Sequence, residues 1–147
     1  MTLKILSCTA LTAFAALAFS APAAAQNNGD LIAADPMANA PSGMQAWRIR
    51  YLTRNDRGAL YEVTGVVVAP RDGMPREPRR VIAWTHGTWG TAEKCAPSLS
   101  SSFYDMTPAL DAVRRGYVVV APDFPGLGSP GPPPYLVGTV TGRSVLD

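Results

Sequence analysis

Four apolar residues, Val81–Trp84, run directly into Thr85-His86-Gly87-Thr88 and a loop of small residues. An apolar run this short, bounded by turn residues, predicts a buried strand rather than a helix. Because the apolar residues are consecutive, the strand is expected to be covered on both faces, as in a parallel sheet. His86 is the only histidine in the chain. Any acid–base chemistry by an imidazole within these residues would therefore fall to this side chain.

Two segments that precede this strand predict an antiparallel hairpin. Ala46–Thr53 alternates between larger apolar and mostly polar side chains, and Ala59–Ala69 is rich in valine. Alternation with a period of two is typical of a strand with one face in water. The segment between them, Arg54–Gly58, carries residues suited to a turn.

The segment after the His-Gly step predicts one helix. Phe103–Arg115 has apolar residues at the spacing of an amphipathic helix, and Gly116 suits the left-handed position at its end. Asp105 or Thr107 could cap its start.

A further apolar run, Tyr117–Ala121, predicts a strand parallel to Arg79–Thr85, since a strand–helix–strand crossover is almost always right-handed. The loop that follows, Pro122–Tyr135, is rich in proline and glycine. It lies at the carboxyl end of a parallel strand, the edge at which open α/β sheets bind ligands. Val140–Asp147 is expected to be helical.

The first 25 residues have the pattern of a secretory signal peptide. Lys4 gives the positive start, and Ile5–Phe19 is apolar but short for a membrane span. Cleavage is expected before Gln26; a single membrane anchor is the alternative. Residues 26–45 are polar and small and predict an irregular N-terminal arm, and residues 46–147 form the partial domain. The expected location is secreted or periplasmic.

Composition excludes several classes of function. The chain has 13 basic and 11 acidic residues, a balance that gives no electrostatic footprint for nucleic acid. The pairs Arg79-Arg80 and Arg114-Arg115 are interpreted as solvated strand and helix ends rather than as a binding patch. Cys95 is the only cysteine outside the predicted signal peptide, which predicts a free thiol or a missing partner. No metal site and no cofactor is expected.

Two stretches resemble the α/β-hydrolase superfamily and, within it, the secretory lipase family. The first is Trp84–Thr88 with Gly90 and then Cys95-Ala96-Pro97-Ser98; the second is Gly116–Gly128. Their order and spacing carry the resemblance, which covers roughly residues 47 to 147. It implies an α/β fold in which an antiparallel hairpin is followed by a βαβ unit. It also implies that the strand 117–121 lies between 59–69 and 79–85, which leaves 79–85 at the edge.

The resemblance also implies an oxyanion site. In this family the backbone N–H after the His-Gly step helps to hold the oxyanion, and the matching residue here is Thr88, supported by Gly87 and His86. Small residues let a backbone donor approach developing negative charge closely. His86 is expected to be structural, with its ring bonded to loop backbone. Asp123 is expected to order the loop after the last strand rather than to act as a catalytic acid.

The nucleophile elbow of this fold, Gly-x-Ser-x-Gly, does not occur in the sequence. Gly128-Ser129-Pro130-Gly131 has the wrong spacing, and no histidine follows His86. The triad runs Ser, Asp or Glu, His in this fold. The sequence is therefore expected to be the N-terminal part of a longer hydrolase, truncated before the elbow and inactive alone.

Three functions follow from these observations. The first is a secreted carboxylic-ester hydrolase of lipase or esterase type, whose full-length form acts on an ester or lipid. The second is a non-catalytic exported fragment or binding module on a hydrolase scaffold, and the third is a secreted peptidase or acyltransferase on the same fold. No nucleic-acid partner and no stable membrane span after signal cleavage are expected.

Overall fold

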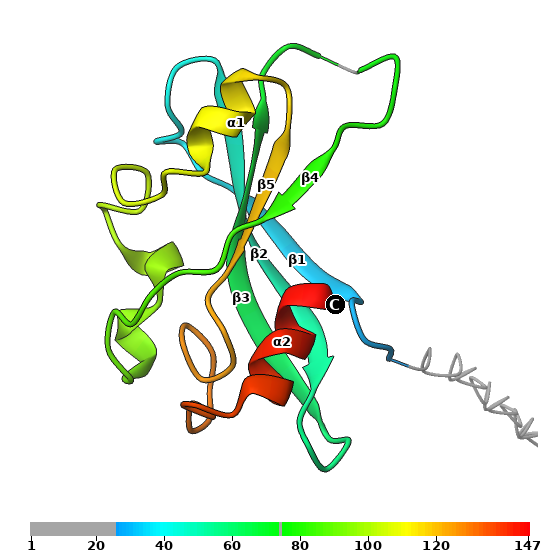
Figure 1. Cartoon of the computed structure of the whole chain (residues 1–147), viewed down its shortest axis with the longest axis vertical. Coiled ribbons are helices and arrows are strands. Elements are labelled where there is room, and N and C mark those ends of the chain that lie inside the picture. Colours follow the sequence, from blue (N-terminus) through cyan, green and yellow to red (C-terminus); the bar gives the residue numbers. More distant parts are fainter. Residues whose placement is uncertain (1–25, 74) are drawn as a thin grey trace, which may run out of the picture.

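The computed structural model describes residues 26–73 and 75–147, which form one five-stranded sheet with the order β1-β2-β3-β5-β4 (Figure 1). The predicted signal peptide lies outside the described residues. The elements in chain order are β1 (Leu31–Pro36), β2 (Met44–Arg54), β3 (Leu60–Pro70), β4 (Val81–Ala83), the 3-10 turns η1 (Glu93–Cys95) and η2 (Pro97–Leu99), α1 (Leu110–Arg114), β5 (Val118–Pro122) and α2 (Gly138–Leu146).

The predicted hairpin is confirmed. β2 and β3 pair antiparallel in an unbroken register from Met44 opposite Pro70 to Arg54 opposite Leu60. In the turn, Asn55 Oδ1 accepts hydrogen bonds from the N–H groups of Arg57 and Ala59, each at 2.9 Å. This side chain satisfies backbone donors that the tight turn would otherwise leave unpaired.

The βαβ unit is also confirmed, together with the order of its strands. β4 and β5 are parallel, with Val81 opposite Val118, and β5 also pairs with β3. β4 is therefore an edge strand. It is only three residues long, and Val81 is 63% exposed. The expectation of a buried strand covered on both faces is therefore wrong for the described residues, because no element of this part of the chain packs beyond the edge.

The prediction of an irregular arm over residues 26–45 is wrong for Leu31–Pro36, which form β1. This strand pairs antiparallel with β2, with Ala34 opposite Ile49. Five of its six residues are exposed, so its side chains carry no alternation from which a strand could be predicted. The pairing with β2 determines its conformation.

The predicted helix Phe103–Arg115 is also shorter than expected, because α1 begins only at Leu110. The preceding residues form turns, in which the Thr107 hydroxyl donates to the Phe103 carbonyl at 2.5 Å. No side chain caps α1, so the capping roles predicted for Asp105 and Thr107 are wrong. Phe103 is nonetheless buried. The apolar residues of this segment therefore pack into the core from turns rather than from one face of a helix.

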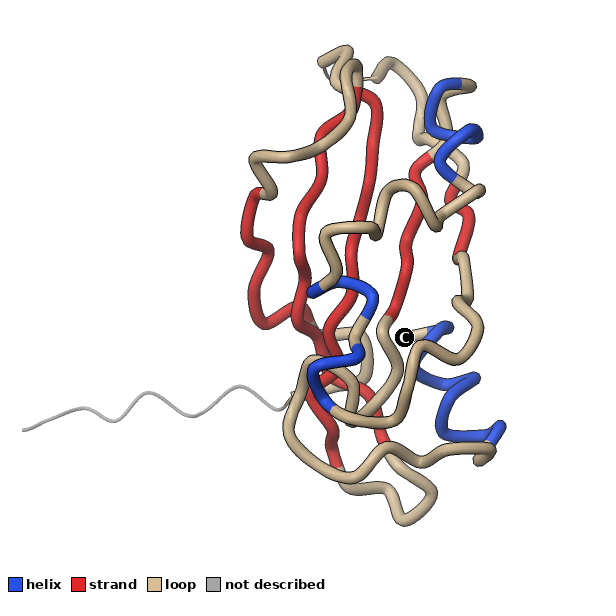
Figure 2. Tube along the Cα trace, turned by 90° about the vertical axis from the view of Figure 1, so that its left-hand side faces the viewer, coloured by secondary structure: helices blue, strands red, loops and turns tan. Residues whose placement is uncertain are grey.

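The two helices pack on opposite faces of β2. Successive side chains of a strand point to opposite faces. Met44 and Ala46 belong to the core cluster that contains Leu110 of α1, whereas the odd-numbered Tyr51 bonds to α2. Figures 1 and 2 place α1 at the end of the sheet where β4 and β5 begin, and α2 near the end where they stop.

Candidate active site

A cavity of about 440 Å³ opens at the carboxyl ends of β4 and β5. Its walls come from three loops: residues 86–91 after β4, residues 124–127 after β5, and residues 133–138 at the start of α2. This is the edge of the sheet at which the sequence predicts a ligand site.

The loop after β4 carries two backbone N–H groups without an acceptor among the described residues, on residues that line this cavity. Gly87 and Thr88 line it, and both are exposed. Among the described residues no oxygen accepts a hydrogen bond from the N–H of either. The Thr88 hydroxyl lies 3.4 Å from the Tyr135 hydroxyl on the facing loop. Thr88, the residue predicted to hold an oxyanion, therefore lines the cavity, and its N–H has no acceptor among the described residues.

His86 is held in the wall of the cavity by its backbone surroundings. Its Nδ1 lies 2.6 Å from the Gly87 carbonyl oxygen, and its Nε2 lies 3.1 Å from the Asp123 carbonyl oxygen. Its ring packs on Phe124, with 4.4 Å between the ring centroids. Both nitrogens face carbonyl oxygens, so neither is directed at a nucleophile. The predicted bonding of the ring to loop backbone is confirmed.

Asp123 joins three segments beneath the cavity, and its side chain is fully buried. Its carboxylate accepts a hydrogen bond from the Thr64 hydroxyl of β3 at 2.6 Å and one from the Ser98 N–H at 2.8 Å. Burial raises the pKa of Asp123, while the bonds from Ser98 and Thr64 and the nearby His86 act to lower it. These contacts confirm that Asp123 orders the loop after β5.

Gly128 lets that loop close over Asp123. Its φ is +69°, a conformation that favours glycine. A Cβ added there would overlap the Thr64 hydroxyl and approach Asp123 Oδ2 to 3.4 Å. The glycine therefore serves the Asp123 contact as well as the turn.

Two site residues have no signal in the sequence. Phe124 adopts φ +71°, which is strained for a non-glycine residue, and this conformation accompanies its packing on His86. Tyr135 lies in a proline-rich loop, and only the fold brings it opposite Thr88.

The C-terminal helix borders the cavity and is fastened to β2. The Tyr51 hydroxyl donates to the Ser144 carbonyl of α2, and the Thr53 hydroxyl donates to Asp147 Oδ2 at 2.6 Å. Burial, with smaller contributions from the negative charges of Asp123 and Asp147, raises the pKa of Tyr51. This phenol thus stays protonated as a donor.

The described residues contain no group of three His, Cys, Asp or Glu side chains that could hold a metal ion. Within the same part of the chain, none of the helices has the length and hydropathy needed to cross a bilayer. Cys95 forms no disulfide with any described residue.

Solved structures with the same arrangement are hydrolases. Candida antarctica lipase A is similar over 82% of this chain, at 20% identity and a TM-score of 0.62. A candidate hydrolase of Legionella pneumophila is similar over 71%, at 28% identity and a TM-score of 0.57. The described residues have the fold of one part of these hydrolases, an antiparallel hairpin followed by a βαβ unit. The rice cell wall degrading esterase LipA of Xanthomonas oryzae is a third match, over 82% of this chain, at 19% identity and a TM-score of 0.55.

The chain spans only part of these proteins: 30% of the lipase, 28% of the Legionella protein and 38% of the Xanthomonas esterase. No protein-family model and no curated protein matches the sequence.

Proposed function

We propose that this chain supplies the oxyanion side of the active site of a carboxylic-ester hydrolase of lipase or esterase type. The observation that carries the proposal is the available N–H of Thr88 in the wall of the cavity at the carboxyl ends of β4 and β5. A donor fixed where negative charge develops is worth about 3 kcal/mol of transition-state stabilisation. Gly87 gives the loop the small residue that close approach requires.

The other walls of the cavity suit an ester with an apolar group. Phe124, Leu127 and Pro133 contribute apolar surface, and the hydroxyls of Thr88 and Tyr135 are the polar groups at the facing loops. A cavity that is mostly apolar, with a few placed polar groups, is typical of a small-molecule site. The proposed substrates are therefore esters, including lipids.

The proposal assigns no nucleophile and no general base to this chain. His86 is committed to backbone oxygens on both sides of its ring. A serine nucleophile needs an imidazole or an equivalent base within hydrogen-bond reach. Both groups would have to come from a segment that this sequence does not contain, and the chain alone should be inactive.

Export forms part of the proposal. Its support is the sequence pattern of residues 1–25, with Lys4, the apolar stretch Ile5–Phe19 and the small residues before Gln26. The proposed location is secreted or periplasmic.

A non-catalytic binding module on the same scaffold is the second candidate. The observation in its favour is the apolar lining by Phe124, Leu127 and Pro133, which can hold a ligand without any catalytic group. Such a module would bind a small apolar ligand between Phe124 and Tyr135 without turning it over.

Sequencing the source DNA beyond the Asp147 codon separates the two. The hydrolase proposal expects an open frame with Gly-x-Ser-x-Gly, and a product that is labelled by a fluorophosphonate probe and hydrolyses p-nitrophenyl butyrate. A stop codon directly after Asp147 favours the binding module.

The 147-residue chain is the matched control and should show neither labelling nor hydrolysis. Ser129 is buried, and its hydroxyl has no hydrogen-bond partner among residues 26–73 and 75–147; it lies in the one sequence that resembles an elbow. Stoichiometric labelling of the chain that Ser129→Ala abolishes would contradict the assignment of the nucleophile to another segment.

A further inference from the structure

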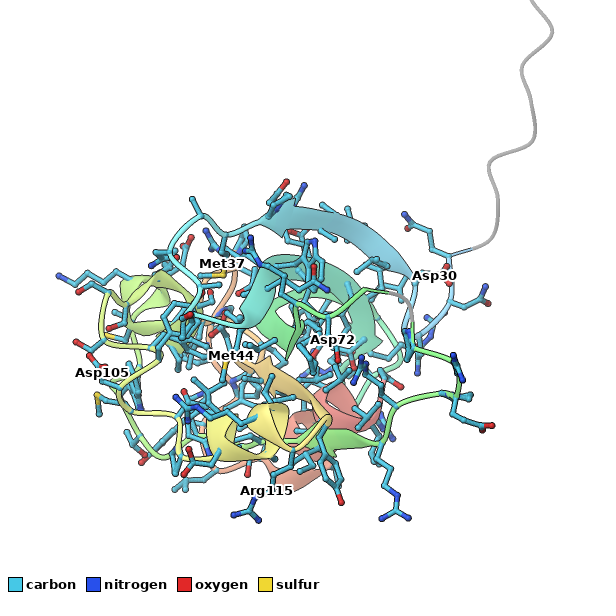
Figure 3. The ribbon with its side chains drawn as sticks, turned by 90° about the horizontal axis from the view of Figure 1, so that it is seen from above. Asp30, Met37, Met44, Asp72, Asp105 and Arg115 are labelled. Atoms are coloured by element: carbon cyan, nitrogen blue, oxygen red, sulfur yellow. The ribbon has the colours of Figure 1, made fainter. Side chains whose placement is uncertain are left out.

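A second cavity, of about 520 Å³ and largely open to solvent, lies at the opposite end of β4 and β5 from the candidate active site. Residues 75–80, which lead into β4, form one side, and residues 115–117, which lead into β5, form the other. Figure 3 looks onto this end of the molecule, where Arg115 projects outward from the end of α1. The sequence interpretation of Arg79-Arg80 and Arg114-Arg115 as separate solvated ends did not foresee that Arg79, Arg80 and Arg115 share this cavity.

Four arginines and one glutamate line the cavity: Arg76, Arg79, Arg80, Arg115 and Glu77. Arg79 has partners of its own, because Nη1 donates to the Gly116 carbonyl at 3.1 Å and Nη2 lies 2.5 Å from Asp72 Oδ1.

The guanidinium groups of Arg76, Arg80 and Arg115 have no hydrogen-bond or ion-pair partner among the described residues. Three arginines whose guanidinium groups lack a partner thus line one cavity, with Glu77 as the only acidic residue among its lining residues. Like charges gathered from segments far apart in the sequence repel one another unless an anion joins them.

The backbone holds these arginines in place. The Arg80 carbonyl accepts a hydrogen bond from the Val118 N–H at 2.9 Å, which ties the start of β4 to the start of β5. Gly116, with φ +91°, reverses the chain after α1 and so places Arg115 beside this junction. The Cα positions of Arg80 and Arg115 are therefore set by the start of the two strands, and ligand binding would order their side chains.

We propose that this cavity binds a multiply charged phosphate group. The planar guanidinium fork matches phosphate oxygens with two parallel hydrogen bonds, and several such forks together favour a group with more than one negative charge. The ring of Tyr117 and the side chains of Pro75 and Pro78 form the apolar remainder of the wall, against which the organic part of a phosphorylated ligand can pack. The site lies apart from the proposed esterase site and does not depend on it.

Isothermal titration of the full chain with pyrophosphate at an ionic strength of about 0.1 M tests the proposal, since charges more than about 10 Å from the ligand are then largely screened. The charge reversal R80E/R115E should weaken binding by about tenfold or more, because it replaces two attractive forks by two repulsive carboxylates. R80Q/R115Q, which only removes the charges, should weaken binding in the same direction.

The matched control is R57E/K94E, which makes the same change in net charge at exposed residues outside this cavity. It should leave pyrophosphate affinity within about twofold of wild type, since distant exposed charges are screened. Near-UV circular dichroism confirms that each variant is folded. Phosphatidylcholine vesicles with and without phosphatidic acid form a second arm.

Saturable binding of pyrophosphate that is lost in R80E/R115E and kept in the control supports a site for a soluble phosphorylated ligand. Binding only to phosphatidic acid vesicles, with the same dependence on Arg80 and Arg115, supports a lipid-borne phosphate. Absence of binding in both arms, or equal loss in R80E/R115E and R57E/K94E, would overturn the proposal.

Discussion

Replacing Asp123 by asparagine should be tolerated, whereas replacing it by alanine should not. The Asp123 carboxylate accepts from Ser98 N–H and from the Thr64 hydroxyl, and that hydroxyl also lies 3.1 Å from the Leu127 carbonyl oxygen. In Asp123→Asn, the amide oxygen would accept from Ser98 and the amide N–H would donate to Thr64. The Thr64 proton would then turn to Leu127, so that Ser98 N–H, the Thr64 hydroxyl and one amide N–H would each keep a partner.

The magnitudes follow from this relay of hydrogen bonds. Asp123→Asn removes a buried charge and keeps the bonds, so the free energy of unfolding should change by less than about 1 kcal/mol. Asp123→Ala leaves the buried Ser98 N–H without its acceptor and opens a small void, which should cost about 3 kcal/mol. Adding Thr64→Val to Asp123→Asn removes the hydroxyl that accepts from the amide N–H. The free energy of unfolding should then fall by about 1–3 kcal/mol.

The dependence on pH has a defined sign. Because burial raises the pKa of Asp123 in the folded chain, the folded state favours the protonated carboxyl more than the unfolded state does. The stabilisation linked to this proton is complete below the unfolded value of about 3.9 and is lost as pH rises through the folded pKa. Asp123→Asn has no such proton, so its stability relative to wild type should improve as pH rises.

Urea denaturation of the full chain and the three variants, followed by near-UV circular dichroism between acidic and neutral pH, measures these differences. Equal losses for Asp123→Asn and Asp123→Ala would refute the relay. If the free energy of unfolding of Asp123→Asn fell further below that of wild type as pH rises, the role of burial in raising the pKa of Asp123 would be refuted.

Two further substitutions test the loop and the edge strand. Gly128→Ala should destabilise the fold by at least about 1 kcal/mol more than Gly131→Ala in urea denaturation. Both glycines have positive φ, but a Cβ at Gly128 would overlap Thr64, whereas a Cβ at Gly131 would meet no atom within 4 Å. Equal losses would mean that the Thr64 contact is unimportant. The exposed edge of β4 is expected to let copies of the chain associate, because unpaired strand edges are templates for pairing. Val81→Lys should reduce this association in sedimentation velocity without lowering stability, because a charge on the edge opposes pairing with another strand; equal association of Val81→Lys and wild type would refute this role of β4.

The parts of the fold that the sequence predicts are those where local pattern and tertiary environment agree. The continuous apolar runs in β4 and β5 indicate strands, and the structure pairs them in parallel. β1 could not be predicted in this way, since its exposed side chains leave only backbone pairing with β2 to define it. The prediction of helix before Leu110 was wrong for the opposite reason. Phe103 is buried, but the turns around it place apolar residues at the same spacing as a helix.

The residues of the candidate site also fall into a predictable and an unpredictable group. His86 and Asp123 stand in motifs whose backbone contacts could be predicted, and their hydrogen bonds confirm those contacts. Phe124 and Tyr135 could not be predicted, because a strained φ and a contact across two loops leave no periodic mark in the sequence. The convergence of Arg80 and Arg115 likewise depends on the parallel pairing of β4 and β5.

The most direct test of the proposed hydrolase function is the kcat for p-nitrophenyl butyrate of Thr88→Pro compared with Thr88→Ala, in the longer enzyme that sequencing past Asp147 is expected to recover. Alanine keeps the backbone N–H and proline removes it. If Thr88 holds the oxyanion, Thr88→Ala should stay near wild type and Thr88→Pro should lose about 10²–10³ in kcat with the fold intact. Equal kcat for the two folded variants would contradict the claim that this chain provides the oxyanion donor.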